Sequence, residues 1–110
     1  MPAKKSSSAA SVLSTWQEKL SNQSLTVGIM GLGYVGLPLG LLYAEKGFNV
    51  IGVDPDERRT KVLNQGKSPI RHIKSERVSA AVKSGKFTAT ADPKDLSKVD
   101  AVLICVPTPL

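Results

Sequence analysis

Apolar and polar positions divide residues 25–110 into short apolar runs and longer segments with helical spacing. The runs Leu25–Met30, Asn49–Val53 and Ala101–Val106 predict apolar strands, and the β-prone stretch FTATA at 87–91 predicts a fourth. Between them the spacing predicts helices over 37–47, 55–66 and 74–85, each ended by a glycine. The segment 67–73 is predicted to be a loop, and 92–100 a turn or a single helical turn.

The order of these elements predicts the fold class. Strands alternate with helices, as in an α/β fold with a Rossmann-like doubly wound parallel sheet. We expect the partial, N-terminal half of such a sheet. Right-handed crossovers would bring the carboxyl ends of the strands at 25–30, 49–53 and 101–106 to one edge, where such sheets bind ligands.

The first 24 residues differ in composition from the rest. Residues 1–10 are rich in Ser, Ala and Lys and predict a loose tail. The near-helical spacing of Val12, Leu13, Trp16 and Leu20 predicts a short amphipathic helix that docks on the domain. We therefore expect a tail with a short helix over 1–24 and an incomplete Rossmann domain over 25–110.

Composition and charge narrow the class of protein. The chain has 110 residues, a net charge of +6 and one cysteine, which excludes an internal disulfide and predicts a reducing, cytoplasmic location. Its apolar runs are shorter than the roughly 20 residues that cross a bilayer, so no membrane span is expected. Nine Lys or Arg and one acid lie between 58 and 86. Because no aromatic residues interleave with this basic band, we interpret it as solvated helix faces rather than a nucleic-acid surface, with anion attraction as the alternative.

Three glycines point to a specific chemistry. Gly31, Gly33 and Gly36 form G-x-G-x-x-G directly after the first predicted strand and at the start of the first helix. In this pattern the first glycine permits a tight turn, the second lets a pyrophosphate approach the backbone, and the third lets the helix pack closely on the strand. The helix N-terminus adds free N–H groups and a partial positive charge. The pattern predicts a dinucleotide pyrophosphate site.

An acid completes this pattern. Asp54 closes the second strand, 23 residues after Gly31. A carboxylate there accepts hydrogen bonds from the ribose hydroxyls of an adenosine and repels a 2′-phosphate, which favours NAD over NADP. The alternative is that Asp54 caps the helix beginning at Pro55. The nearby Arg58 and Arg59 bear on this preference, because arginine can bind a 2′-phosphate. With Asp54 present, we expect Arg59 beside the adenine or ribose and Arg58 toward solvent.

Two further residues are weaker candidates. Cys105 lies between apolar neighbours in a predicted strand, which favours a buried, inert thiol over a nucleophile. His72 is the only histidine, and no acid or metal ligand stands at a suitable spacing from it. We interpret His72 as an ordinary loop residue and predict no metal site.

Five stretches of the chain, in order, are GLGYVGLPLG, GFNVIGVDPDERR, GKSPIRHI, GKFTATADP and VLICVPTPL. Together they resemble the N-terminal part of the UDP-glucose/GDP-mannose dehydrogenase family. The loop IRHIKSERV and the N-terminal helix are most similar to UDP-N-acetylglucosamine 6-dehydrogenases. The resemblance implies NAD as cofactor, with Tyr34 and Val35 lining the pyrophosphate turn, Asp54 on the ribose and Arg59 beside it. It also implies that Thr108 contacts the cofactor. The residues agree, because a rigid Pro-Thr-Pro turn at the end of a strand presents one hydroxyl. The alternative is that this turn only ends the strand.

The resemblance also implies an activity. Family members carry out a two-step, NAD-dependent oxidation of the C6 alcohol of a nucleotide sugar, here a UDP-sugar, to a carboxylate, with two NAD per sugar, and a homo-oligomer is implied. They are several times longer, and their catalytic residues correspond to positions beyond Leu110, so we expect none in this chain and no turnover by it alone. A stand-alone NAD-binding or sensing module is the alternative. Another NAD enzyme, such as a hydroxyacid dehydrogenase, shares the glycines but not GYVGLP followed by VPTP.

Overall fold

A computed structural model describes residues 13–15, 17–18 and 24–105. Residues 13–15 and 17–18 are helical. The elements that follow are β1 (Thr26–Met30), α2 (Gly36–Glu45), β2 (Asn49–Val53), α3 (Glu57–Asn64), α4 (Ser75–Lys83), β3 (Phe87–Thr90), the 3₁₀ helix η1 (Pro93–Lys98) and β4 (Ala101–Ile104). Gly47, Gly66 and Gly85 have positive φ and follow the ends of α2, α3 and α4, as predicted.

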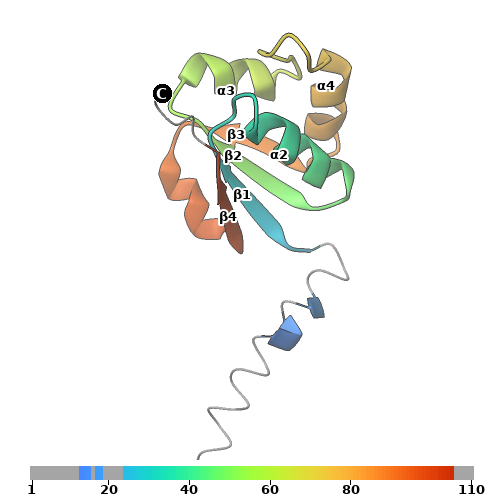
Figure 1. Ribbon diagram of the computed structural model, residues 1–110, viewed down its shortest axis with the longest axis vertical. Helices are drawn as coiled ribbons and strands as arrows, with labels where there is room; N and C mark the ends of the chain where they lie inside the picture. The colour runs from blue at the N-terminus through green and yellow to red at the C-terminus, as the bar shows by residue number, and fades with distance from the viewer. Residues whose placement is uncertain (1–12, 16, 19–23, 106–110) are drawn as a thin grey trace, which may run out of the picture.

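The four strands form one parallel sheet in the order β3-β2-β1-β4 (Figure 1). In this order β1 lies between β2 and β4, with Met30 opposite Val53 on one side and Ile104 on the other. The carboxyl ends of the three strands therefore meet at one edge. The predicted Rossmann-like α/β fold is confirmed, and so is the shared edge.

The two faces of the sheet are covered by different elements. On one face α2 packs so closely that a Cβ at Gly40 would meet Phe87 at 3.0 Å and Val50 at 3.5 Å. Residues of β1, α2, α3, α4 and β3 form one core cluster, in which Ile29 and Leu41 are fully buried. On the opposite face η1 approaches β1, where a Cβ at Gly28 would meet the Leu96 side chain at 2.7 Å.

An ion pair joins α2 and α4. Arg77 of α4 donates through Nε and Nη2 to the two carboxylate oxygens of Glu45 on α2, at 2.7 and 3.0 Å. This hydrogen bond is the main reason that the pKa of Glu45 lies below its usual value. Both side chains are more than a third exposed, so solvent and salt weaken the attraction.

Arg77→Ala is expected to lower the free energy of unfolding by about 0.2–1 kcal/mol, the range of exposed ion pairs. Urea denaturation at low and high salt measures the effect, and the loss should shrink in high salt. Lys83→Ala, on the exposed surface of the same helix, is the matched control. An equal loss in both variants would mean that removing a basic side chain from α4, and not the ion pair with Glu45, sets the change, because alanine itself has the higher helix propensity.

Three features differ from the sequence-based expectation or extend it. The strand β4 lies at the sheet edge with Val102 and Ile104 exposed by 42 % and 71 %. Cys105 follows this strand instead of lying within it and is half-buried, so the prediction of a buried strand thiol was wrong. Leu13 is 64 % exposed; the other apolar residues of the predicted N-terminal helix, Val12, Trp16 and Leu20, lie outside the described residues, so its docking stays a prediction.

Candidate functional site

The glycine turn joins β1 to α2 at the carboxyl edge of the sheet. Gly31 has a φ of 98°, which residues with a side chain rarely adopt, and its N–H donates to the Val53 carbonyl of β2 at 2.8 Å. Gly36 packs against Gly31: a Cβ at position 36 would lie 1.6 Å from the Gly31 carbonyl oxygen. These are the two geometric roles, tight turn and close packing, that the sequence predicts for the first and third glycines.

The middle of the turn is open. Among the described residues other than its chain neighbours, a Cβ at Gly33 would meet one atom at van der Waals distance, Nη1 of Arg59 at 4.0 Å. Tyr34 and Val35 follow with side chains that are 74 % and 60 % exposed. Val35 is the N-cap residue of α2, and it forms no side-chain capping bond; the first turn of the helix holds no acidic residue. The first turn of α2 therefore presents its positive end with no acidic side chain of its own.

Asp54 follows β2 and ties the neighbouring segments to the turn. Its Oδ2 accepts from the Leu32 N–H at 2.9 Å, and its Oδ1 accepts from the Asp56 N–H at 2.9 Å. The alternative role as a helix cap was wrong: α3 begins at Glu57, and its cap is Asp56, whose carboxylate accepts from the Arg58 and Arg59 N–H groups. Asp54 is 5 % exposed. Its hydrogen bonds stabilise the glycine turn and the segment that leads into α3, and not the first turn of α3 itself.

Arg59 lies beside Asp54. Its Nη1 donates to Asp54 Oδ2 at 3.2 Å, an ion pair that the sequence did not reveal. Burial disfavours the charged form of Asp54, but the amide hydrogen bonds from Leu32 and Asp56 and the nearby Arg59 charge outweigh it, so the pKa of Asp54 lies below its usual value of 3.8. Asp54 is therefore ionised at neutral pH.

The lowered pKa of Asp54 predicts a pH dependence of stability. A carboxyl whose folded pKa is lowered stabilises the fold fully above its unfolded pKa, and this contribution is lost as the pH falls through the folded pKa. Between pH 5 and pH 3, the free energy of unfolding should therefore fall more steeply for the natural chain than for Asp54→Asn. Urea denaturation across this pH range measures both slopes; parallel slopes would contradict the assignment.

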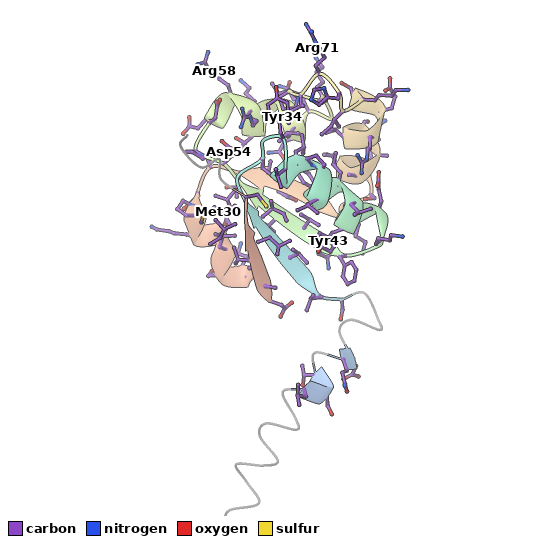
Figure 2. All side chains as sticks on the ribbon, in the orientation of Figure 1. Met30, Tyr34, Tyr43, Asp54, Arg58 and Arg71 are labelled. Atoms are coloured by element: carbon purple, nitrogen blue, oxygen red, sulfur yellow. The ribbon has the colours of Figure 1, made fainter. Side chains whose placement is uncertain are left out.

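The remaining candidates are placed as follows. Arg58 is exposed and projects outward, as expected, and so does Arg71 (Figure 2). His72 lies in the predicted loop, but its ring contacts that of Tyr34, with centroids 5.3 Å apart and planes tilted by 35°. No sequence signal links these two residues, which are far apart along the chain. Thr108 lies outside the described residues.

The family of the chain follows from comparison with known proteins. The sequence model of the UDP-glucose/GDP-mannose dehydrogenase family, NAD binding domain, matches residues 25–110. The chain belongs to this family. A UDP-N-acetyl-D-mannosamine dehydrogenase of Methanococcus aeolicus is 39 % identical over 82 residues, which cover 74 % of this chain and 18 % of the relative. An NDP-N-acetyl-D-galactosaminuronic acid dehydrogenase of Ralstonia nicotianae is 40 % identical, over 76 % of this chain and 19 % of the relative.

Solved structures agree with this membership in the UDP-glucose/GDP-mannose dehydrogenase family. A UDP-D-ManNAc dehydrogenase from Pyrococcus horikoshii matches with a TM-score of 0.74 and 32 % identity over 78 % of this chain and 21 % of that one. A ternary complex of GDP-mannose dehydrogenase from Pseudomonas aeruginosa matches with a TM-score of 0.72 and 35 % identity, over 76 % and 20 %. The chain thus spans about a fifth of the length of the curated relatives it matches.

The geometry fits NAD, the cofactor of this domain family. The open space at Gly33 is a gap that a side chain would fill, next to an uncapped helix start, which suits a diphosphate. A carboxylate has about four acceptor positions, and Asp54 uses three of them, on Leu32, Asp56 and Arg59. Among the described residues no donor uses the fourth position, on Oδ1, so this position can accept from a ligand hydroxyl, and movement of Arg59 would free a second, on Oδ2.

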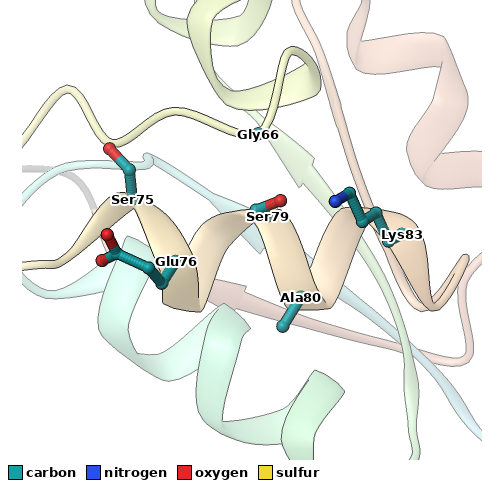
Figure 3. A pocket seen from close by; sticks show the side chains of 6 residues that line it. All are labelled: Gly66, Ser75, Glu76, Ser79, Ala80 and Lys83. Atoms are coloured by element: carbon teal, nitrogen blue, oxygen red, sulfur yellow. The ribbon is translucent and has the colours of Figure 1, made fainter.

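Other places in the described part of the chain offer less chemistry. An open hollow of about 490 Å³ lies over α4, with Ser75, Ser79 and Lys83 along one face of the helix, next to Gly66 (Figure 3). It contains no residue of the glycine turn and no second acid beside Glu76. Among the residues that the structure describes, no three His, Cys, Asp or Glu side chains gather as metal ligands. Likewise, no described helix has the length and apolar character needed to span a bilayer.

Proposed function

We propose that this chain supplies the adenosine-diphosphate half of the NAD site in a nucleotide-sugar 6-dehydrogenase. The observation that carries the proposal is the pairing of an open glycine turn with a buried carboxylate that is hydrogen-bonded to it through Leu32. In this proposal Gly31, Gly33 and Gly36 shape the turn and Asp54 binds the adenosine ribose. The other proposed cofactor contacts are Tyr34, Val35, Arg59 and Thr108.

The protein groups and the cofactor have separate tasks in this proposal. Backbone N–H groups at Gly33 and at the start of α2 bind the diphosphate, and the charge of Asp54 orients the ribose and disfavours a 2′-phosphate. Bound NAD supplies the hydride acceptor. Converting a primary alcohol to a carboxylate removes two hydride equivalents and adds one oxygen from water, so each sugar consumes two NAD. The catalytic groups are proposed to lie in the part of the family's length that this chain does not span.

The proposed substrate is a UDP-sugar oxidised at C6 to the uronic acid. Two relatives support a nucleotide-sugar substrate by name: one is a UDP-N-acetyl-D-mannosamine dehydrogenase and the other an NDP-N-acetyl-D-galactosaminuronic acid dehydrogenase. The resemblance of the loop 70–78 to that of UDP-N-acetylglucosamine 6-dehydrogenases favours UDP-N-acetylglucosamine, with UDP-glucose as the alternative. For the product we propose a role in polysaccharide biosynthesis. Homo-oligomer formation, a cytoplasmic location and the absence of nucleic-acid binding stay predictions.

Calorimetric titration of the purified chain with NAD and NADP tests the cofactor part of the proposal. We expect NAD to bind and NADP to bind more weakly, because Asp54 and a 2′-phosphate repel each other. A chain that unfolds cooperatively but binds no NAD would contradict the proposal. With UDP-sugar and NAD together we expect no NADH, since the catalytic residues are proposed to lie elsewhere; turnover by this chain would overturn that point.

The substrate part of the proposal needs a longer protein that contains this domain. NADH release on addition of UDP-N-acetylglucosamine, UDP-N-acetylmannosamine or UDP-glucose would support the dehydrogenase and identify the sugar. NAD binding without oxidation of any UDP-sugar would favour the alternative, a stand-alone binding or sensing module. Oxidation of a hydroxyacid instead would point to a different NAD enzyme.

A further inference from the structure

The loop between α3 and α4 is built to present two residues at its apex. Ile70 and Ile73 are both buried in the core, while Arg71 and His72 between them are exposed. Ser68 braces the loop: its hydroxyl donates to the Ile70 carbonyl at 2.8 Å and accepts from the Ile70 N–H at 3.2 Å. Because both ends of this dipeptide are held by the core, the position of His72 is set by the fold.

The apex residue His72 meets the glycine turn. Its ring lies 5.3 Å from that of Tyr34, centroid to centroid, and Tyr34 stands directly after Gly33. Tyr34 is 74 % exposed, so its ring is not held by the core. Arg59 reaches the same turn from α3, since its Nη1 lies 4.0 Å from the Cβ position of Gly33. The open part of the turn is thus bordered by side chains from two separate segments.

We propose that His72 is a positioning residue for the dinucleotide: it fixes the Tyr34 ring beside the glycine turn, and the ring pair forms a wall of the diphosphate subsite. This inference rests on the proposed NAD-binding function. An exposed aromatic ring without a neighbour samples several rotamers and loses that freedom when a ligand binds. A ring already held by a second ring loses less, so the contact with His72 raises the affinity for NAD without a direct bond to it.

The first experiment uses the single histidine as a probe. Because His72 is the only histidine, its imidazole C–H signals are unique in the NMR spectrum of the labelled chain. During titration with NAD we expect these signals and the Gly33 amide signal to shift with the same apparent Kd. If the Gly33 signal saturates while His72 stays unchanged, the inference is overturned and NAD binding stands. If neither signal moves, the proposed function itself fails.

Variants then separate positioning from a structural role. His72→Ala should raise the Kd for NAD about 3- to 10-fold, and His72→Phe, which keeps a ring, should restore it to within about twofold. Arg71→Ala is the matched control on the same apex, because Arg71 is exposed and projects away from the domain (Figure 2). The thermal midpoint should change little in all three, since both positions are exposed. Equal losses in His72→Ala and Arg71→Ala, or no rescue by phenylalanine, would overturn the inference.

Discussion

Asp54→Ala is expected to weaken NAD binding by about 1–3 kcal/mol, the scale of losing a charged hydrogen-bond partner. The proposed ribose contact disappears, and so does the acceptor for the Leu32 N–H, which is left in a buried segment. Arg59 also loses its ion-pair partner, so its positive charge beside the turn is no longer balanced by Asp54. The variant should therefore discriminate less between NAD and NADP than the natural chain does. Calorimetric titration with both cofactors measures the two effects.

Two controls separate binding from structure in this prediction. Asp54→Asn keeps the size of the side chain and an oxygen that can accept from Leu32, but removes the charge, so it should lose NADP discrimination with less loss of stability. Asp56→Ala removes the cap of α3 and should cost about 1 kcal/mol of stability while leaving Asp54 in place. If Asp54→Ala binds NAD as well as the natural chain does, the Asp54 carboxylate of the natural chain shapes the turn and does not bind the ribose.

The sheet and most helix ends could be predicted because they depend on local patterns. Apolar runs, their flanking glycines and the alternation of strand and helix are all present in the sequence, and the parallel order follows from the rule of right-handed crossovers. The burial of Cys105 depends instead on which strand lies at the edge of the sheet. Because β4 has a partner on one side only among the described strands, the residue after it is half-buried despite its apolar neighbours.

The residues of the candidate site could be predicted from the sequence, but the contacts between residues far apart in the chain could not. The stretch Asp54-Pro55-Asp56 offers two carboxylates for one helix start, and local pattern cannot choose between them. The choice is made by a hydrogen bond between Asp54 and Leu32, 22 residues earlier in the chain, which exists only after β1 and β2 have paired. The contact of His72 with Tyr34 is of the same kind, since it depends on where Ile70 and Ile73 enter the core.

Gly33→Val is expected to fold and to lose NAD affinity by more than about 2 kcal/mol, roughly 30-fold. Position 33 has room for a side chain, because the first atom that its Cβ would meet is 4.0 Å away, and its φ is not in the left-handed region. The added methyl groups would occupy the space through which a pyrophosphate approaches the backbone. Titration with NAD and a thermal melt of the same preparation measure the two properties separately. A folded variant with normal affinity would mean that the diphosphate binds elsewhere.

Gly36→Ala is the matched contrast within the same turn, and it should behave in the opposite way. A Cβ at position 36 would lie 1.6 Å from the Gly31 carbonyl oxygen and 3.1 Å from Cγ2 of Ile29. Relief of this clash requires α2 to move away from β1, at a cost of about 3 kcal/mol or more in stability. One glycine thus protects a space for the ligand, and the other protects a contact within the protein. Similar melting behaviour of the two variants would contradict this division, because it would place both glycines in the same role.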